Sequence, residues 1–210
     1  MDGDRDPEDT PPPAPSTAEA IAERAAELFS EKGFAATSIR EIAEAAGVTK
    51  PTLYYYFGSK EGLVRHILLT AIRSFAAAVE SAEAASTLRR TLHAIAVGQL
   101  SFADSHPATV NLMCRLHHQP PGEAPLEDLR GLQEEGLTRL AHVFEEAMAS
   151  GEIAPRDARL VGLSFLGALI IHVAHRQRTD PASRPPAEVV ARQIVDLFLH
   201  GARGAPEVTP

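Results

Sequence analysis

Residues 33–60, GFAATSIREIAEAAGVTKPTLYYYFGSK, contain two short helix signals separated by a tight turn. Ser38 can cap the first helix, and Glu41 three residues later can bond back to the cap amide, which makes a capping box. Gly47 supplies the left-handed backbone that ends a helix in a sharp turn, and Thr49 can cap the helix that follows. Two short helices joined by such a glycine turn are typical of a helix-turn-helix.

The second helix of the pair divides into an inward and an outward face. Leu53, Tyr56 and Phe57 follow the spacing i, i+3, i+4, which predicts that they pack inward. The outward row then consists of Lys50, Pro51, Thr52, Tyr54 and Tyr55. Lysine offers donors to guanine edges or phosphates, threonine offers a hydroxyl and a methyl group, and tyrosine has a hydroxyl that reaches phosphate. The positive end of the helix dipole further favours contact with the negatively charged phosphates. The row therefore predicts a surface that enters a DNA groove.

Residues 33–63 resemble the N-terminal signature of the TetR family of bacterial transcriptional repressors. The family pattern is G-[FY]-x-x-[TS]-[ST]-[VI]-x-x-[IL]-A-x-x-A-G-V-[ST]-x-[GP]-x-[LI]-Y-x-[YH]-F-x-[SN]-K-x-x-L, and the chain follows it with hardly a departure. The resemblance implies a homodimer whose recognition helices enter successive major grooves of a palindromic operator, about 34–36 Å apart. It also implies release from double-stranded operator DNA by a small apolar or amphipathic effector.

The outward row and the resemblance together assign contacts to individual residues. We expect base-edge contacts from Lys50, Pro51, Thr52 and Tyr54, with Arg40 at the groove edge, and phosphate contacts from Ser38, Tyr55 and Lys60. The role of Lys60 follows from the family alone, since it occupies the position where the family makes a backbone phosphate contact.

The net charge of −8 argues against a nucleic-acid partner at first sight. Residues 33–66, however, contain four basic and three acidic residues, and we expect the acids to lie away from the DNA-facing side. A few well-placed cations suffice for a dimeric binder, so we expect only a modest dependence of DNA affinity on salt.

The periodicity of the remaining chain predicts an all-α fold of about nine helices, an N-terminal three-helix domain followed by a larger helical domain. We expect a disordered acidic, proline-rich tail over 1–16, a helix-turn-helix domain over 17–62, a ligand-binding and dimerisation domain over 63–203, and a disordered tail over 204–210. Helices are expected near 60–80, 86–104, 107–118, 125–149, 156–177 and 186–201.

The last two of these helices are apolar over a wide arc, at 160–173 and 189–199, so they should be buried on all sides. In the family, the last two helices pair with their two-fold mates, which implies an isologous homodimer interface here. The alternative is an internal core helix. No stretch approaches the ~20 apolar residues of a membrane span, and the single Cys114 fits a reducing compartment. We therefore expect a cytoplasmic protein with no membrane partner.

The larger domain should hold a small-molecule pocket among its central helices. Candidate lining residues are Phe75, Phe102, Met113, Leu116, His117, Phe144, Met148, Phe165 and His172. No nucleophile, base and acid have a recognisable catalytic spacing and no phosphate-binding glycine loop is present, so we expect no enzyme and no cofactor.

Two alternatives remain open at this point. One is a metal- or thiol-responsive sensor that uses Cys114 with nearby Met113, His117 and His118, although such residues on an apolar helix are more often core, and no metal site is predicted. The other is a small-molecule binding protein with a vestigial DNA-binding head.

Overall fold

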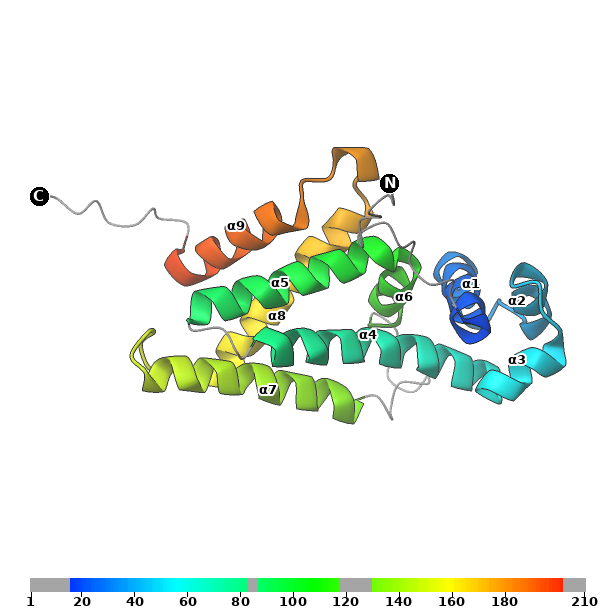
Figure 1. Cartoon of the computed structure of the whole chain (residues 1–210), viewed down its shortest axis with the longest axis horizontal. Coiled ribbons are helices and arrows are strands. Elements are labelled where there is room, and N and C mark those ends of the chain that lie inside the picture. The colour runs from blue at the N-terminus through cyan, green and yellow to red at the C-terminus, as the bar shows by residue number, and fades with distance from the viewer. Residues whose placement is uncertain (1–15, 83–86, 118–129, 202–210) are drawn as a thin grey trace, which may run out of the picture.

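The computed structural model describes residues 16–82, 87–117 and 130–201, and the regular structure in these ranges is helical throughout (Figure 1). The helices are α1 (Thr17–Lys32), α2 (Ile39–Ala45), α3 (Lys50–Phe57), α4 (Lys60–Ala82), α5 (Leu88–Ser105), α6 (Pro107–His117), α7 (Arg130–Ala149), α8 (Ala158–Gln177), the short 3-10 helix η2 (Pro181–Ser183) and α9 (Ala187–His200). The expected all-α fold is confirmed. Of the tails expected over 1–16 and 204–210, only Ser16, which caps α1, is among the described residues.

Helices α1, α2 and α3 gather at one end of the molecule and form the N-terminal head (Figure 1). Helix α4 starts in this head and runs toward the opposite end of the molecule, where it lies beside α5 and α7. Helix α6 packs against α1, and α9 packs against α5 on the side away from α7. The chain is therefore elongated, with α4 joining the head to the larger helical part.

Two separate hydrophobic cores hold these helices together. The head core contains buried residues of α1, α2 and α3, and it also takes in the first half of α4 as far as Ile72. Two residues of α6, Leu112 and Leu116, complete it. The hydrophobic core of the head thus extends beyond the boundary expected at residue 62, because α4 and α6 cover the face that three short helices cannot bury alone.

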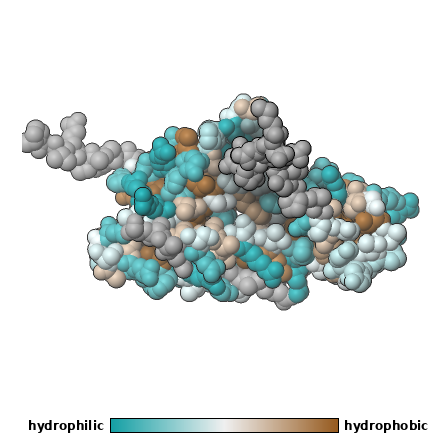
Figure 2. Space-filling view, viewed as in Figure 1, coloured by the Kyte–Doolittle hydropathy of each residue, from teal (hydrophilic) through white to brown (hydrophobic). Residues whose placement is uncertain are grey.

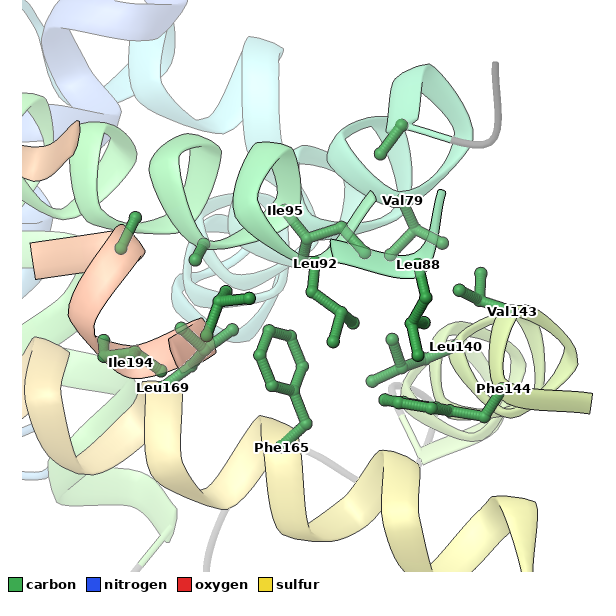
Figure 3. Packing of buried hydrophobic residues seen from close by; sticks show 14 of the residues in the cluster. Val79, Leu88, Leu92, Ile95, Leu140, Val143, Phe144, Phe165, Leu169 and Ile194 are labelled. Carbon is green, nitrogen blue, oxygen red and sulfur yellow. The ribbon is translucent and has the colours of Figure 1, made fainter. Parts of the chain in front are cut away.

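The main core lies between α5, α7, α8 and α9, with the second half of α4 at its edge. Figure 3 shows Leu92 and Ile95 of α5 directed toward Phe165 and Leu169 of α8, and Phe144 of α7 lies nearby. The rings of Phe144, Phe165 and Phe198 form an aromatic cluster with centroids 5.2–6.4 Å apart. Tilted and edge-on pairs of this kind add to the free energy gained by burial.

Helix α8 presents large apolar side chains to solvent in the single chain, whereas the sequence predicts that this helix is buried on all sides. Leu160, Leu163, Ile170 and Ile171 are 46–69% exposed, and their spacing places them on one face. By length and composition α4 and α8 are both apolar enough to cross a membrane. This differs from the expectation that no stretch approaches the length of an apolar membrane span. Helix α4, however, contributes buried residues to both cores, as a core helix of a soluble protein does.

Candidate DNA-binding surface

The first helix of the pair, α2, begins with the capping box that the sequence predicts. The Ser38 hydroxyl oxygen accepts a hydrogen bond from the Glu41 amide (3.2 Å), and the Ser38 amide donates to the Glu41 carboxylate (2.8 Å). Lys32 of α1 also donates to that carboxylate, at 2.8 Å. The hydrogen bond from Lys32, followed by those from Ser38, lowers the pKa of Glu41 to about 2. These contacts fix the start of α2 against the end of α1.

The turn between α2 and α3 depends on Gly47, whose φ of +66° lies in the left-handed region. The amide of Val48 then donates to the carbonyl of Ala43 (3.0 Å), which satisfies a carbonyl at the helix end. Thr49 caps α3 by accepting from the Thr52 amide (3.3 Å). The turn therefore fixes the angle at which α3 leaves α2.

Helix α3 buries one residue fully, Leu53, and half-buries Phe57. Tyr55 is 83% exposed, and Tyr54 is 48% exposed, as an outward row requires. The prediction that Tyr56 packs inward is wrong, because its side chain is 45% exposed. An eight-residue helix that packs mainly against α2 and α4 has a narrow buried arc, and Leu53 and Phe57 fill it.

The hydroxyl groups of this surface take part in capping, yet they can still act on DNA. The oxygens of Thr49 and Thr52 lie 2.8 Å apart, so one of the two hydroxyls donates to the other and the second retains its hydrogen. Ser38 uses its oxygen as the cap acceptor and retains its hydrogen as well. Each can donate that hydrogen to a phosphate oxygen.

The expected cations differ in what surrounds them. Lys50 is exposed at the first residue of α3, where the helix dipole reinforces its charge. Arg40 donates through Nε to Glu44 at 2.7 Å, and this hydrogen bond raises the pKa of Arg40. The expectation that the acids lie away from the DNA-facing side is therefore wrong for Glu44. An exposed pair of this kind is weak and exchanges partners at little cost.

The ammonium of Lys60 makes contacts within the head. Its ammonium is 4.4 Å from the ring centroid of Phe34 and 3.5 Å from the carbonyl oxygen of Ala35, in the segment between α1 and α2. A lysine over an aromatic ring is held by a cation–π attraction that is weak at a partly exposed site. To reach a phosphate, Lys60 has to leave Phe34.

The surface of the head also shows how its affinity for DNA would arise. In Figure 2 the lower edge of the head, where Figure 1 places α3, is mostly pale, the colour of intermediate hydropathy, while a hydrophilic patch lies above it. The outward row is thus dominated by tyrosine and threonine with few charges.

The candidate effector residues do not converge on one site among the described residues. Phe144 and Phe165 are fully buried in the main core, and Phe75 and Met148 lie partly buried against it. Met113 and Leu116 belong to the head core. Phe102 stacks on His106 with centroids 4.4 Å apart, and His172 is exposed with its Nδ1 2.8 Å from the Ala168 carbonyl oxygen. The side chain of His117 lies outside the described residues.

The residues proposed for metal sensing do not form a cluster in the part of the chain that the structure describes. Within those ranges no group of three or more His, Cys, Asp or Glu side chains is placed to hold a metal ion. Burial raises the pKa of the Cys114 thiol, which disfavours the thiolate that binds metals and reacts with oxidants. His118 lies outside the described residues.

Two residues of this surface were not among the expected contacts. Tyr56 adds a third exposed tyrosine to α3, and Thr49 presents a hydroxyl beside that of Thr52. The signal for Tyr56 was present in the sequence, since three consecutive tyrosines span more than half of a helix circumference.

The same head occurs in known proteins. Residues 17–67 match the family model described as bacterial regulatory proteins, tetR family. The HTH-type transcriptional repressor KstR2 of Rhodococcus jostii is 46% identical over 65 residues, which cover 28% of this chain and 32% of that relative. The matched segment thus spans about a third of the length of the first curated relatives, which share the head.

Solved structures extend the similarity to most of the chain. The TetR family transcriptional regulator PfmR from Thermus thermophilus has a TM-score of 0.74 and 28% identity, over 87% of this chain and 98% of that one. A structure of AibR in complex with isovaleryl coenzyme A and operator DNA has a TM-score of 0.70 and 25% identity, over 87% and 97% of the two chains. The fold of the larger helical part is therefore shared as well as that of the head.

Proposed function

The chain belongs to the TetR family of transcriptional regulators, and we propose that it binds a palindromic operator as a homodimer and represses transcription until a small molecule releases it. The single observation that carries the proposal is the geometry of α2 and α3. Both helices are capped by their own side chains, their angle is fixed by Gly47, and α3 presents Lys50 and its tyrosines to solvent. A rigid short helix with an exposed polar row suits the major groove.

Individual contacts follow from the exposure and partners of each residue. Lys50, Pro51, Thr52 and Tyr54 are proposed to meet base edges, because they lie on the exposed side of α3 near its N-terminus. Ser38, Tyr55 and Lys60 are proposed to hold phosphates, with Arg40 at the groove edge after its release from Glu44. Phosphate contacts position the protein, and base contacts give it sequence preference.

The homodimer is proposed to form through α8 and α9. Besides the exposed apolar face of α8, α9 exposes Val189 and Leu197, at 41% and 55%. Exposed apolar side chains gathered in a contiguous area mark an interaction surface. A two-fold axis through this face buries the same residues of both copies.

The effector is proposed to bind in the larger helical part, and AibR supports a class for it. That structural neighbour was solved with isovaleryl coenzyme A and operator DNA together. An acyl group on a carrier combines an apolar chain with a carbonyl, which agrees with the apolar main core here. The effector acts through its higher affinity for the conformation that leaves DNA.

The alternatives are not favoured. A metal-responsive sensor would need a ligand cluster, and the described residues contain none. A thiol-responsive sensor would need a reactive thiolate, which burial disfavours at Cys114 by raising its pKa. A vestigial head would have no reason to keep a capping box, a glycine turn and an exposed polar row together.

The test is fluorescence anisotropy of the full-length protein with labelled DNA from the region flanking its own reading frame, compared with random DNA of equal length. We expect tight binding to a discrete segment. Lys50→Ala and Thr52→Ala should each weaken operator binding by about 5- to 150-fold, the value of one lost base contact, and should lower the preference over random DNA.

Arg24→Ala is the matched control, since it removes a positive charge from α1 of the same head. Its effect should be small and equal on both DNAs. Equal losses on operator and random DNA for Lys50→Ala and Thr52→Ala would refute the assignment of base contacts.

A further inference from the structure

Helix α5 carries two polar residues on its inward face, Thr91, whose hydroxyl donates to the carbonyl oxygen of Thr87, and Gln99. Leu88, Leu92, Ile95 and Ala103 are at most 5% exposed, and their spacing defines the inward face of the helix. Gln99 falls on the same face, since it is four residues after Ile95 and four before Ala103. Figure 3 shows that Leu92 and Ile95 point to the region in front of Phe165. Gln99 therefore lies in a stripe that is mostly apolar, and the other polar residue of the stripe, Thr91, already has its hydrogen-bond acceptor.

The amide nitrogen of Gln99 is buried and has no hydrogen-bond partner within the described part of the chain. Leaving a buried donor unsatisfied costs the protein the desolvation of that group, so such donors are rare and call for an explanation. By contrast, the side-chain amide of Gln177, which also reaches α5, has a hydrogen-bond acceptor. The Nε2 of Gln177 in α8 donates to the carbonyl oxygen of Ala103 at 2.8 Å.

We propose that Gln99 is the polar anchor of the effector, and that its amide donates to a neutral carbonyl oxygen on an otherwise apolar molecule. The unsatisfied donor defines the chemistry of the missing group, which must accept a hydrogen bond. The apolar residues of the main core define the remainder of the molecule. This inference rests on the proposed function, because it names the ligand class of the proposed effector domain.

A neutral acceptor fits better than a carboxylate because Arg176, the buried cation among the described residues, is already engaged. Arg176, 8% exposed, donates two hydrogen bonds of 2.7 Å to Asp104 and one of 2.6 Å to the carbonyl oxygen of Pro185. A carboxylate beside Gln99 would therefore enter the core without a countercharge, which is costly. Ketones, esters, amides and thioesters carry the neutral oxygen instead.

The position of Gln99 also links ligand binding at this residue to the N-terminal head. The preceding residue, Gly98, lies so close to α4 that a Cβ there would be 3.1 Å from the Cβ of Ala78. Any shift of α5 around Gln99 therefore displaces α4, which begins in the head. A ligand that satisfies the donor stabilises the conformation in which α5 has moved to admit it.

The first experiment needs no ligand. Thermal unfolding of the full-length Gln99→Leu variant should have a midpoint equal to or above that of the wild type, because an unsatisfied donor is replaced by an apolar group of similar size. Gln177→Leu is the matched control, and its midpoint should fall by about 2–4 °C because a formed hydrogen bond is lost. A fall of the same size in Gln99→Leu would overturn the proposal, since it would show that Gln99 already has a partner.

The second experiment measures binding of 2-octanone, 2-decanone, 2-dodecanone and decanoate by isothermal titration. At least one ketone should bind the wild type, and Gln99→Leu should bind it about 2- to 10-fold more weakly, the value of one hydrogen bond, while Gln177→Leu binds it as the wild type does. No binding of any ketone, equal binding by Gln99→Leu, or tighter binding of decanoate than of 2-decanone would each overturn the proposal. Since neither experiment contains DNA, failure here is distinct from failure of operator binding.

Discussion

Replacement of Asp104 by alanine should destabilise the protein more than replacement of any other surface carboxylate. The Asp104 carboxylate accepts hydrogen bonds from three nitrogens of two arginines. Arg176 donates to its two oxygens through Nε and Nη2, each at 2.7 Å, and Arg184 donates through Nη1 at 3.4 Å. These bonds join the end of α5 to the end of α8 and to the segment that leads into α9. Asp104→Ala leaves Arg176, only 8% exposed, with two nitrogens that have lost their acceptor.

The size of the effect follows from burial. Removing one partner of a fully buried ion pair costs about 3–5 kcal/mol. The side chain of Asp104 is 34% exposed, so water can replace part of the lost contact. We therefore expect a loss of about 2–3 kcal/mol, which corresponds to a decrease of roughly 4–10 °C in the unfolding midpoint of a chain of this length.

The assay is thermal and urea unfolding at one fixed protomer concentration, because dimerisation makes the midpoint depend on concentration. Asp196→Ala is the control. Asp196 is paired with Arg89 across α9 and α5, but the two side chains are 49% and 46% exposed, so the expected loss is about 0–1 kcal/mol. Equal losses for the two variants would refute the argument that burial sets the strength of the Asp104 contact.

Three further predictions concern acid stability, assembly and the turn. Hydrogen bonds from Arg176 hold the pKa of Asp104 below its usual range. The stability that ionised Asp104 gives the folded protein is therefore complete above the unfolded pKa of about 4, and it is lost as the pH falls through the folded pKa. The difference in urea stability between wild type and Asp104→Ala should shrink below about pH 4. Ile171→Glu should give monomers in light scattering, whereas glutamate at exposed Ala94 should leave the dimer intact. Gly47→Ala should cost about 1–2 kcal/mol at φ +66° and weaken operator binding, whereas Gly131→Ala, within α7, should not lower the urea midpoint.

The parts of the fold that depend on near neighbours were predictable from the sequence. The capping box at Ser38 and Glu41 formed, and so did the cap at Thr49 and the turn at Gly47. Each involves residues at most a few positions apart, so its geometry is determined by the local chain. The helix bounds follow from the same signals.

The outward face of α3 was predictable only in part. Spacing alone assigned Tyr56 inward, but the inward arc of a helix depends on how many neighbours cover it. Helix α3 packs mainly against α2 and α4, and Leu53 with Phe57 already fill the space that these two helices leave. The assignment of Lys60 to a phosphate likewise could not anticipate its contact with Phe34, which lies 26 positions away in the chain.

The effector residues could not be chosen from the sequence for a similar reason. Phe165 and Leu116 are both large apolar residues in a helical stripe, yet one lies in the main core and the other in the head core. Which core receives a side chain depends on the packing of α6 against α1, a long-range contact. The sequence places Gln99 four residues after Ile95 on α5, and only the absence of an acceptor in the described structure singles it out.

The two cores also explain how the distant parts of the chain can affect each other. Helix α6 buries Leu112 and Leu116 in the head core, and Arg115 between them donates to the carbonyl oxygens of Ser30 and Glu31 at the end of α1. Carbonyls in the last turn of a helix have no partners within their own helix, so the guanidinium completes the end of α1. A movement of α6 must therefore either carry α1 with it or break these bonds and expose the two leucines. Helices α1, α2 and α3 share the head core, and Lys32 of α1 also pairs with Glu41 of α2, so a movement of α1 is passed to α2 and α3 mainly through that core.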